Sequence, residues 1–237
     1  MSNQDVYQSR TNFVVESLNY SKKGQMRKIL DAGFIGDHFD LIKAEGAPFH
    51  FGLLKSLQEN DFVIGLDNSK EKLDLFLQNE KTKEWQQKFN VDYRLGSIFE
   101  TGLLAGEIDA ILLLEVFEHL FNPYAAFNEI KRVLKPGGSF IMTYPNPLAL
   151  HRHLRYSCQN NVLDKKFLKI FKGAVDHLIF PHPVCLINYL QVLGFKIEKV
   201  AFIKFDIKAL SWLHYFLAKI GLTKKYSSYI GIHAIKE

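Results

Sequence analysis

The chain has 237 residues, of which 47% are hydrophobic, with 30 lysines and arginines against 25 acidic residues. This length suits one sizeable core, and no apolar run approaches the ~20 residues that a membrane-spanning helix needs. The start of the chain is polar, which argues against a signal peptide. Cys158 and Cys185 form no CxxC pair, which argues against a disulfide framework or a cysteine-rich metal site. We therefore expect one cytoplasmic domain.

Strand-like runs alternate with helical patterns as far as about residue 150. After residues 1–27, which we expect to be helical, apolar runs bounded by turn signals follow at residues 28–33, 62–67, 91–97, 108–114 and 139–144. The clearest helix begins at a cap residue, Asn122, and a first-turn proline, Pro123, and we expect Lys135–Gly138 to end it. This alternation predicts right-handed βαβ units and a doubly wound α/β fold with a parallel sheet.

The C-terminal part differs in both pattern and charge. We expect a polar stretch at residues 151–176, then a helix that ends near residues 193–194, and two strands at residues 195–203 and 229–235. Residues 151–237 carry 14 basic and 5 acidic residues, whereas residues 1–150 carry 16 and 20. A basic part of this kind suits nucleic acid, an anionic lipid surface or an acidic small substrate, and equally a solvated surface.

Ligands of a doubly wound sheet bind beyond the carboxyl ends of its strands. Gly33 and Gly36 follow the first strand and allow a tight turn with close approach of the backbone to a ligand. Asp67 ends the second strand, where a carboxylate can accept hydrogen bonds from the hydroxyls of a ribose. Ser97 and Ile98 follow the third strand, where a hydroxyl and an apolar side chain can bracket an adenine. These residues together predict a nucleoside site.

Two longer segments carry a family resemblance. Residues 108–120, IDAILLLEVFEHL, and residues 129–138, EIKRVLKPGG, resemble the small-molecule class I S-adenosylmethionine-dependent methyltransferases. The resemblance covers roughly residues 28–203. It implies a Rossmann-like, mostly parallel sheet of seven strands that ends in an antiparallel strand pair. It also implies S-adenosyl-L-methionine as the cofactor and, within one domain of residues 1–237, an acceptor lid at residues 148–182.

The resemblance assigns the strand ends to parts of this cofactor. It places Gly33, Phe34 and Gly36 at the methionine, and Asp67 and Asn68 at the ribose. It places Ser97 and Ile98 at the adenine, and Leu114 and Glu115 at the sulfonium. Two positions depart from the family pattern, since the first loop has Ile35 and Asp37 where further glycines are usual, and Ser97 stands where an acidic residue is common. The altered loop supports a second hypothesis, a catalytically silent methyltransferase-like binding or scaffold protein.

Methyl transfer from a sulfonium is an in-line displacement, so the protein positions the acceptor, excludes water and, for a hydroxyl acceptor, removes a proton. We expect no metal to be required. The candidate bases are the histidines that follow the fourth and fifth strands, His119, His151 and His153, because imidazole titrates near neutral pH. A structural role is the alternative for each: His119 would orient the neighbouring helix, and the other two would belong to a polar lid.

We expect O-methylation of a small molecule or glycan. Basic lid residues, among them Arg152 and Arg155, suit an anionic acceptor. An RNA methyltransferase is a weaker alternative, because no Asn/Asp-Pro-Pro-aromatic segment follows the fourth strand, and a nicotinamide dehydrogenase is weaker still, because the glycine loop opens no helix. The aromatic and aliphatic residues 207–221 would either lie on a membrane surface or pack as a helix against the last strands or a second subunit. The oligomeric state is open.

Overall fold

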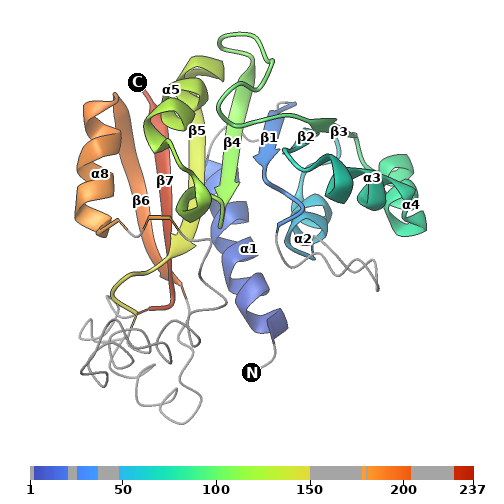
Figure 1. Cartoon of the computed structure of the whole chain (residues 1–237), viewed down its shortest axis with the longest axis horizontal. Coiled ribbons are helices and arrows are strands. Elements are labelled where there is room, and N and C mark those ends of the chain that lie inside the picture. Colours follow the sequence, from blue (N-terminus) through green and yellow to red (C-terminus); the bar gives the residue numbers. More distant parts are fainter. Residues whose placement is uncertain (1–2, 21–25, 37–47, 150–177, 180, 204–226) are drawn as a thin grey trace.

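A single sheet of seven strands organises the chain (Figure 1). The computed structural model describes residues 3–20, 26–36, 48–149, 178–179, 181–203 and 227–237. The strands are Lys28–Ala32 (β1), Phe62–Asp67 (β2), Val91–Leu95 (β3), Ile108–Leu114 (β4), Leu134–Pro145 (β5), Phe195–Ile203 (β6) and Tyr229–Lys236 (β7). Their order is β3-β2-β1-β4-β5-β7-β6, with β1 to β5 parallel and β7 antiparallel to both β5 and β6. The expected fold class, a doubly wound and mostly parallel sheet with a final antiparallel pair, is confirmed.

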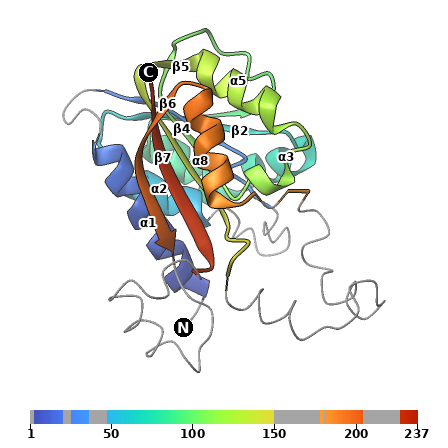
Figure 2. The same ribbon diagram turned by 90° about the vertical axis from the view of Figure 1, so that its left-hand side faces the viewer.

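Helices cover both faces of this sheet (Figures 1 and 2). They are Asn3–Tyr20 (α1), Pro48–Ser56 (α2), Lys70–Gln78 (α3), Glu80–Lys88 (α4), Pro123–Val133 (α5) and Pro183–Val192 (α8), with a 3-10 turn (η1) at Phe117–His119. Side chains of α1 to α4 pack in one hydrophobic cluster, and side chains of α5 and α8 pack in a second cluster on the opposite face. None of the helices in the described part of the chain is long and apolar enough to cross a bilayer. Residues 207–221 all lie outside the described residues.

Strand β4 shows why the central strands read as continuous apolar runs. Its residues Ile111 and Leu113 join the cluster under α5 and α8, while Ala110 and Leu112 join the cluster under α1 to α4. All four side chains are fully buried. A strand covered by helices on both faces has no solvent side, so its sequence shows no alternation of apolar and polar residues.

The junction between α5 and β5 differs in detail from the expectation. Helix α5 begins as predicted, with the Asn122 side chain accepting a hydrogen bond from the backbone N–H of Ala125, and it ends at Val133. Strand β5 then begins at once with Leu134, which pairs with Ile108, and the residues up to Gly138 form an irregular excursion before regular pairing resumes at the next residue. The helix therefore ends just before the expected stop, and Lys135–Gly138 form a bulge inside the strand, with Gly137 at φ +72° and strand pairing on both sides of it.

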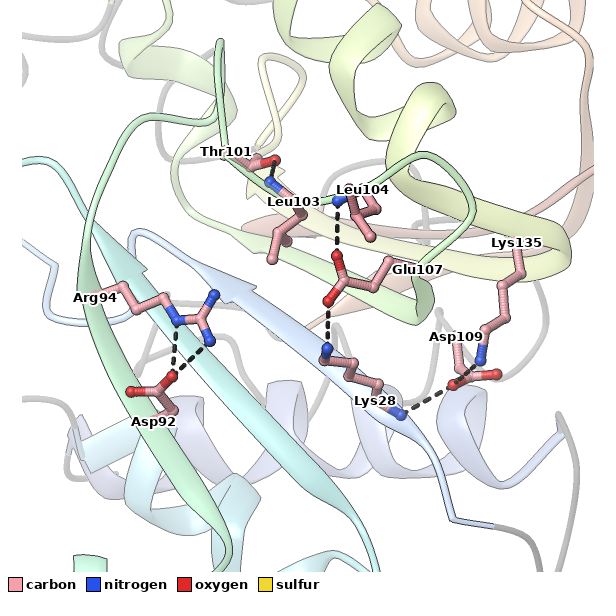
Figure 3. A network of polar contacts seen from close by, with 9 residues as sticks. All are labelled: Lys28, Asp92, Arg94, Thr101, Leu103, Leu104, Glu107, Asp109 and Lys135. Atoms are coloured by element: carbon pink, nitrogen blue, oxygen red, sulfur yellow. Dashed lines mark hydrogen bonds and ion pairs between the residues drawn. The ribbon is translucent and has the colours of Figure 1, made fainter.

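Charged side chains at the amino ends of β1 and β4 form a network that holds this bulge (Figure 3). The carboxylate of Asp109 accepts hydrogen bonds from the backbone N–H of Lys28 at 3.0 Å and from Nζ of Lys135 at 2.7 Å. Glu107 joins the ammonium of Lys28 to the backbone N–H of Leu104, and the contact with Lys28 lowers the pKa of this carboxyl. Since these charges are matched with one another at the edge opposite the strand ends of interest, the network has a structural role.

Candidate functional site at the carboxyl ends of the strands

The order of the strands reverses between β1 and β4, and the loops that follow these two strands come together there. Gly33, directly after β1, has φ +73°, and a Cβ built on it would lie 2.5 Å from Cγ2 of Val116. Its N–H donates to the carbonyl of Leu66 at 2.7 Å. Only glycine combines this conformation with so close a neighbour. Reversal points of this kind are where doubly wound sheets bind ligands.

The loop after Gly33 presents its backbone to this edge and its side chains to the core. The ring of Phe34 is 6% exposed and stacks on Tyr93 at 5.1 Å, with His50 at 4.8 Å, and Ile35 is also buried. Gly36 is exposed and has φ +68°. If this loop holds the methionine end of a cofactor, Phe34 contributes its backbone rather than its ring.

Asp67 lies at the end of β2 with its carboxylate held by two backbone donors. Oδ1 accepts a hydrogen bond from the N–H of Ser69 at 3.0 Å, and Oδ2 accepts one from the N–H of Ile35 at 3.4 Å. Asp67 is 6% exposed, whereas the neighbouring Asn68 is exposed. The geometry therefore places an oriented carboxylate beside the glycine loop, at the strand end where the sequence predicts a ribose contact.

The end of β3 contributes a hydroxyl and apolar side chains. The Oγ of Ser97 accepts a hydrogen bond from the N–H of Phe99, which fixes a short turn, and Ile98 is buried in the core under α5. The ring of Phe99 lies 4.6 Å from that of Phe121, which is 76% exposed. Sequence reasoning missed Phe121, because only the fold brings the segment after η1 next to the turn after β3.

Glu115 follows β4 in a conformation that is rare for a residue with a side chain. Its φ is +58°, and its N–H donates to the carbonyl of Thr143 on β5 at 2.9 Å. Its carboxylate lies 3.4 Å from the guanidinium of Arg10, which belongs to α1. Leu114, the preceding residue, is half-buried. Sequence reasoning named Leu114 and Glu115 but missed Arg10, since nothing in the pattern of α1 indicates which strand end it reaches.

His119 is the one candidate base within the described residues. It ends η1 with 27% of its side chain exposed, and its Nε2 lies 4.0 Å from Oε1 of the buried Glu118. The carbonyl of Glu118 accepts hydrogen bonds from the N–H groups of Leu178 and Ile179. His151 and His153 lie outside the described residues, as do Arg152, Arg155 and most of the expected lid.

Both flanks of the expected lid are anchored at this edge of the sheet. On the N-terminal flank, Asn146 is fully buried, and its side chain donates to the carbonyl of Ser227 at 2.7 Å and accepts from the N–H of Leu148. On the C-terminal flank, Leu178 is held by Glu118 through the backbone contact described above. The chain between these two anchors therefore starts and ends beside the strand ends.

Three buried polar side chains, His50, Asp31 and Tyr93, lie on the core side of this loop, and the sequence did not indicate them. His50 of α2 contacts Asp31 of β1 through Nδ1 at 2.7 Å and the hydroxyl of Tyr93 of β3 through Nε2 at 3.1 Å. Burial and the nearby charge of Asp31 raise the pKa of Tyr93. Because the ring of Phe34 packs on both His50 and Tyr93, these two side chains fix the path of the loop after β1.

Known proteins share parts of this sequence and its overall fold. Residues 46–142 match a methyltransferase domain family. An uncharacterized methyltransferase of Schizosaccharomyces pombe is 38% identical over 90 residues, which are 37% of this chain and 32% of that protein, so the match spans only about a third of the curated relative.

Solved structures match over the whole chain at low identity. A S-adenosylmethionine-dependent methyltransferase from Aquifex aeolicus has a TM-score of 0.61 at 15% identity, covering 100% of this chain and 94% of its own. A geranyl diphosphate C-methyltransferase from Streptomyces coelicolor, bound to Mg²⁺, geranyl diphosphate and S-adenosyl-L-homocysteine, has a TM-score of 0.63 at 16% identity, covering 97% of this chain and 80% of its own. At these identities the likeness concerns the fold.

Proposed function

We propose that the chain is a class I S-adenosylmethionine-dependent methyltransferase, in line with the family match over residues 46–142 and the shared fold, and that it transfers the methyl group of S-adenosyl-L-methionine to an oxygen of a small molecule or glycan. The observation that carries the proposal is the meeting of Gly33, Asp67 and Glu115 at the point where the strand order reverses. These residues supply a close backbone approach, a ribose acceptor and a carboxylate beside the expected sulfonium.

The cofactor's sulfonium supplies an activated methyl group, so the chain has to bind, orient and deprotonate the acceptor. His119 is the group that we assign to proton removal, because its imidazole is partly exposed at the end of η1, directly after the segment that contains Glu115. Glu118, buried behind it, would orient the ring. Methyl transfer in line with the breaking C–S bond requires no metal, and we propose none.

An anionic acceptor fits the charge of the chain. Residues 151–237 have a large excess of basic residues, and the segment between the two anchors at Asn146 and Leu178 includes Arg152 and Arg155. Guanidinium groups bind phosphate or carboxylate in a bidentate fork. The geranyl diphosphate methyltransferase that shares the fold is one whose small-molecule substrate is an anion. We therefore propose a phosphorylated or carboxylated small molecule as the acceptor class.

Calorimetric titration with S-adenosyl-L-homocysteine tests the proposal. Saturable binding of one ligand per chain is expected, and subsequent transfer of a labelled methyl group to an anionic acceptor would identify the reaction. A chain that binds no S-adenosyl-L-homocysteine at millimolar concentration is not a methyltransferase. A chain that binds the ligand but transfers no methyl group to any acceptor, including RNA, would instead be the catalytically silent binding protein that the altered glycine loop suggests.

A further inference from the structure

Buried hydroxyl groups without a hydrogen-bond partner gather where β5 ends and β7 begins. Within the part of the chain that the structure describes, four buried hydroxyls make no hydrogen bond, those of Ser17, Thr143, Tyr144 and Ser228. Three of the four lie in the last residues of β5 or directly before β7, two strands that run side by side (Figure 1). Buried polar groups are normally bonded, so such a concentration indicates a partner from outside the chain.

The register of these strands places two of the hydroxyls on one face of the sheet. Tyr144 stands opposite Ile230, and both side chains pack in the cluster under α5 and α8. Pairing continues beyond the strand, since the N–H of Asn146 donates to the carbonyl of Ser228 at 2.9 Å. Tyr144 and Ser228 are therefore diagonal neighbours on the same face, with Cα atoms about 7–8 Å apart. Thr143 faces the other side, because side chains alternate along a strand.

This end of β5 lies beside the position that we assign to the sulfonium. Leu114 pairs with Thr143, the residue before Tyr144. The ring of Tyr144 lies 6.0 Å from that of Phe117 at an angle of 63°, and Phe117 begins the turn η1 that ends at the assigned base, His119. In-line transfer puts the acceptor oxygen on the far side of the methyl group from the sulfur, so we expect the acceptor to reach the end of β5.

Both hydroxyls can donate a hydrogen bond to a ligand. Burial raises the pKa of Tyr144, so its phenol keeps the proton at neutral pH and is a donor rather than a base. The hydroxyl of Ser228 has one donor proton and two acceptor lone pairs. Two such groups on one face match a ligand that carries several hydroxyls better than a ligand with one hydroxyl on an apolar body.

We propose that the hydroxyls of Tyr144 and Ser228 bind oxygens of the acceptor, and that the acceptor is a polyhydroxylated molecule of the sugar class. The inference rests on the proposed function and narrows its acceptor from small molecules in general to polyols. It also assigns substrate contacts to two residues outside the segments that we assign to the cofactor. In the free chain the two buried hydroxyls are a cost to stability, and the bound acceptor supplies the hydrogen bonds that they lack.

Thermal unfolding separates acceptor binding from a structural role of these hydroxyls. Tyr144→Phe keeps the ring and removes a hydroxyl that makes no bond, so the melting temperature should be unchanged or higher. Tyr93→Phe is the comparison, because the hydroxyl of Tyr93 bonds Nε2 of His50 at 3.1 Å, and it should lower the melting temperature. A melting temperature of Tyr144→Phe that falls as far as that of Tyr93→Phe would show a bonded hydroxyl in the free chain and overturn the inference.

Two probes test the acceptor class by calorimetry on the chain loaded with S-adenosyl-L-homocysteine. Glucose 6-phosphate and 6-hydroxyhexyl phosphate share a phosphate and six carbons and differ in their number of hydroxyls. Glucose 6-phosphate should bind more tightly, and Tyr144→Phe or Ser228→Ala should weaken it about two- to tenfold, as for a neutral hydrogen bond. The same variants should change 6-hydroxyhexyl phosphate less.

Ser17→Ala is the matched control, since it also removes a buried hydroxyl without a partner. Ser17 lies far from the strand ends, because the carbonyl of its neighbour Leu18 accepts a hydrogen bond from Arg27, directly before β1. Ser17→Ala should bind both probes and S-adenosyl-L-homocysteine as the wild type does. Tyr144→Phe and Ser228→Ala should likewise keep the affinity for S-adenosyl-L-homocysteine.

Tighter binding of 6-hydroxyhexyl phosphate, equal weakening of both probes, or binding of glucose 6-phosphate that is unchanged in both variants would overturn the inference. If the loaded wild type binds neither probe, a panel of neutral hexoses and hexuronates replaces them, and the same two variants decide on any member that binds. A chain that binds S-adenosyl-L-homocysteine but no member of the panel does not use a sugar, which overturns the inference and leaves the methyltransferase proposal standing. A wild-type chain that binds no S-adenosyl-L-homocysteine refutes the proposed function itself.

Discussion

Replacing Asp67 removes the carboxylate that we assign to the ribose of the cofactor. Hydrogen bonds to a charged group contribute about 1.5 to 3 kcal/mol, so Asp67→Ala should weaken S-adenosyl-L-homocysteine about ten- to a hundredfold. The alanine also leaves the N–H groups of Ile35 and Ser69 without this acceptor. Asp67→Asn keeps one oxygen for them, so it isolates the loss of charge and should give the smaller part of the effect.

Calorimetric titration gives the affinity, and thermal unfolding shows whether either variant has lost its fold. Asp92→Asn is the matched control, because Asp92 on β3 pairs with Arg94 at 2.7 Å in a partly exposed ion pair (Figure 3) and faces no strand end. It should bind the ligand like the wild type. If Asp67→Ala and Asp67→Asn fold and also bind with wild-type affinity, the carboxylate is not part of the cofactor site and the assignment of the strand ends is wrong.

Three further predictions concern folding, pH and the acceptor. Gly33→Ala puts a Cβ 2.5 Å from a valine methyl at φ +73°, so we expect loss of ligand binding and a melting temperature several degrees lower, and an unchanged melting curve would contradict the close contact. Burial lowers the pKa of His233 to about 4 from 6.5; the unfolded chain therefore binds the extra proton between these values, and the unfolding free energy should fall as pH drops below 6.5, by at most about 1.4 kcal/mol per unit. His233→Gln should lose this part of the pH dependence, which urea unfolding of both proteins at pH 7 and pH 5 measures. If the unfolding free energy changes by the same amount between these pH values in the wild type and in His233→Gln, the pKa of His233 does not contribute. Replacing Arg152 and Arg155 together should raise the Michaelis constant for an anionic acceptor while cofactor affinity is unchanged, and turnover should fall with ionic strength; kinetics insensitive to both would assign these residues to a solvated surface.

The sequence by itself determined the fold and the edge of the sheet where chemistry belongs. Apolar runs such as Ile108–Leu114 and the cap at Asn122 are local signals, because strand burial and helix capping depend on residues that are close in sequence. The residues at strand ends follow from the same reading, since parallel strands bring their carboxyl ends to one edge. For this reason the sequence could predict that Gly33 and Asp67 lie at this edge, but it could not predict which residues they contact there.

Only the tertiary structure decided which side chains meet at that edge. Arg10 reaches Glu115 because α1 crosses the face of the sheet, and Phe34 points into the core because His50 and Tyr93 form a surface for its ring. The helix stop after α5 became a bulge because pairing with β4 resumes beyond it. Each of these depends on packing between segments far apart in the chain, where many partners are compatible with the same local pattern and the shape of the core selects one.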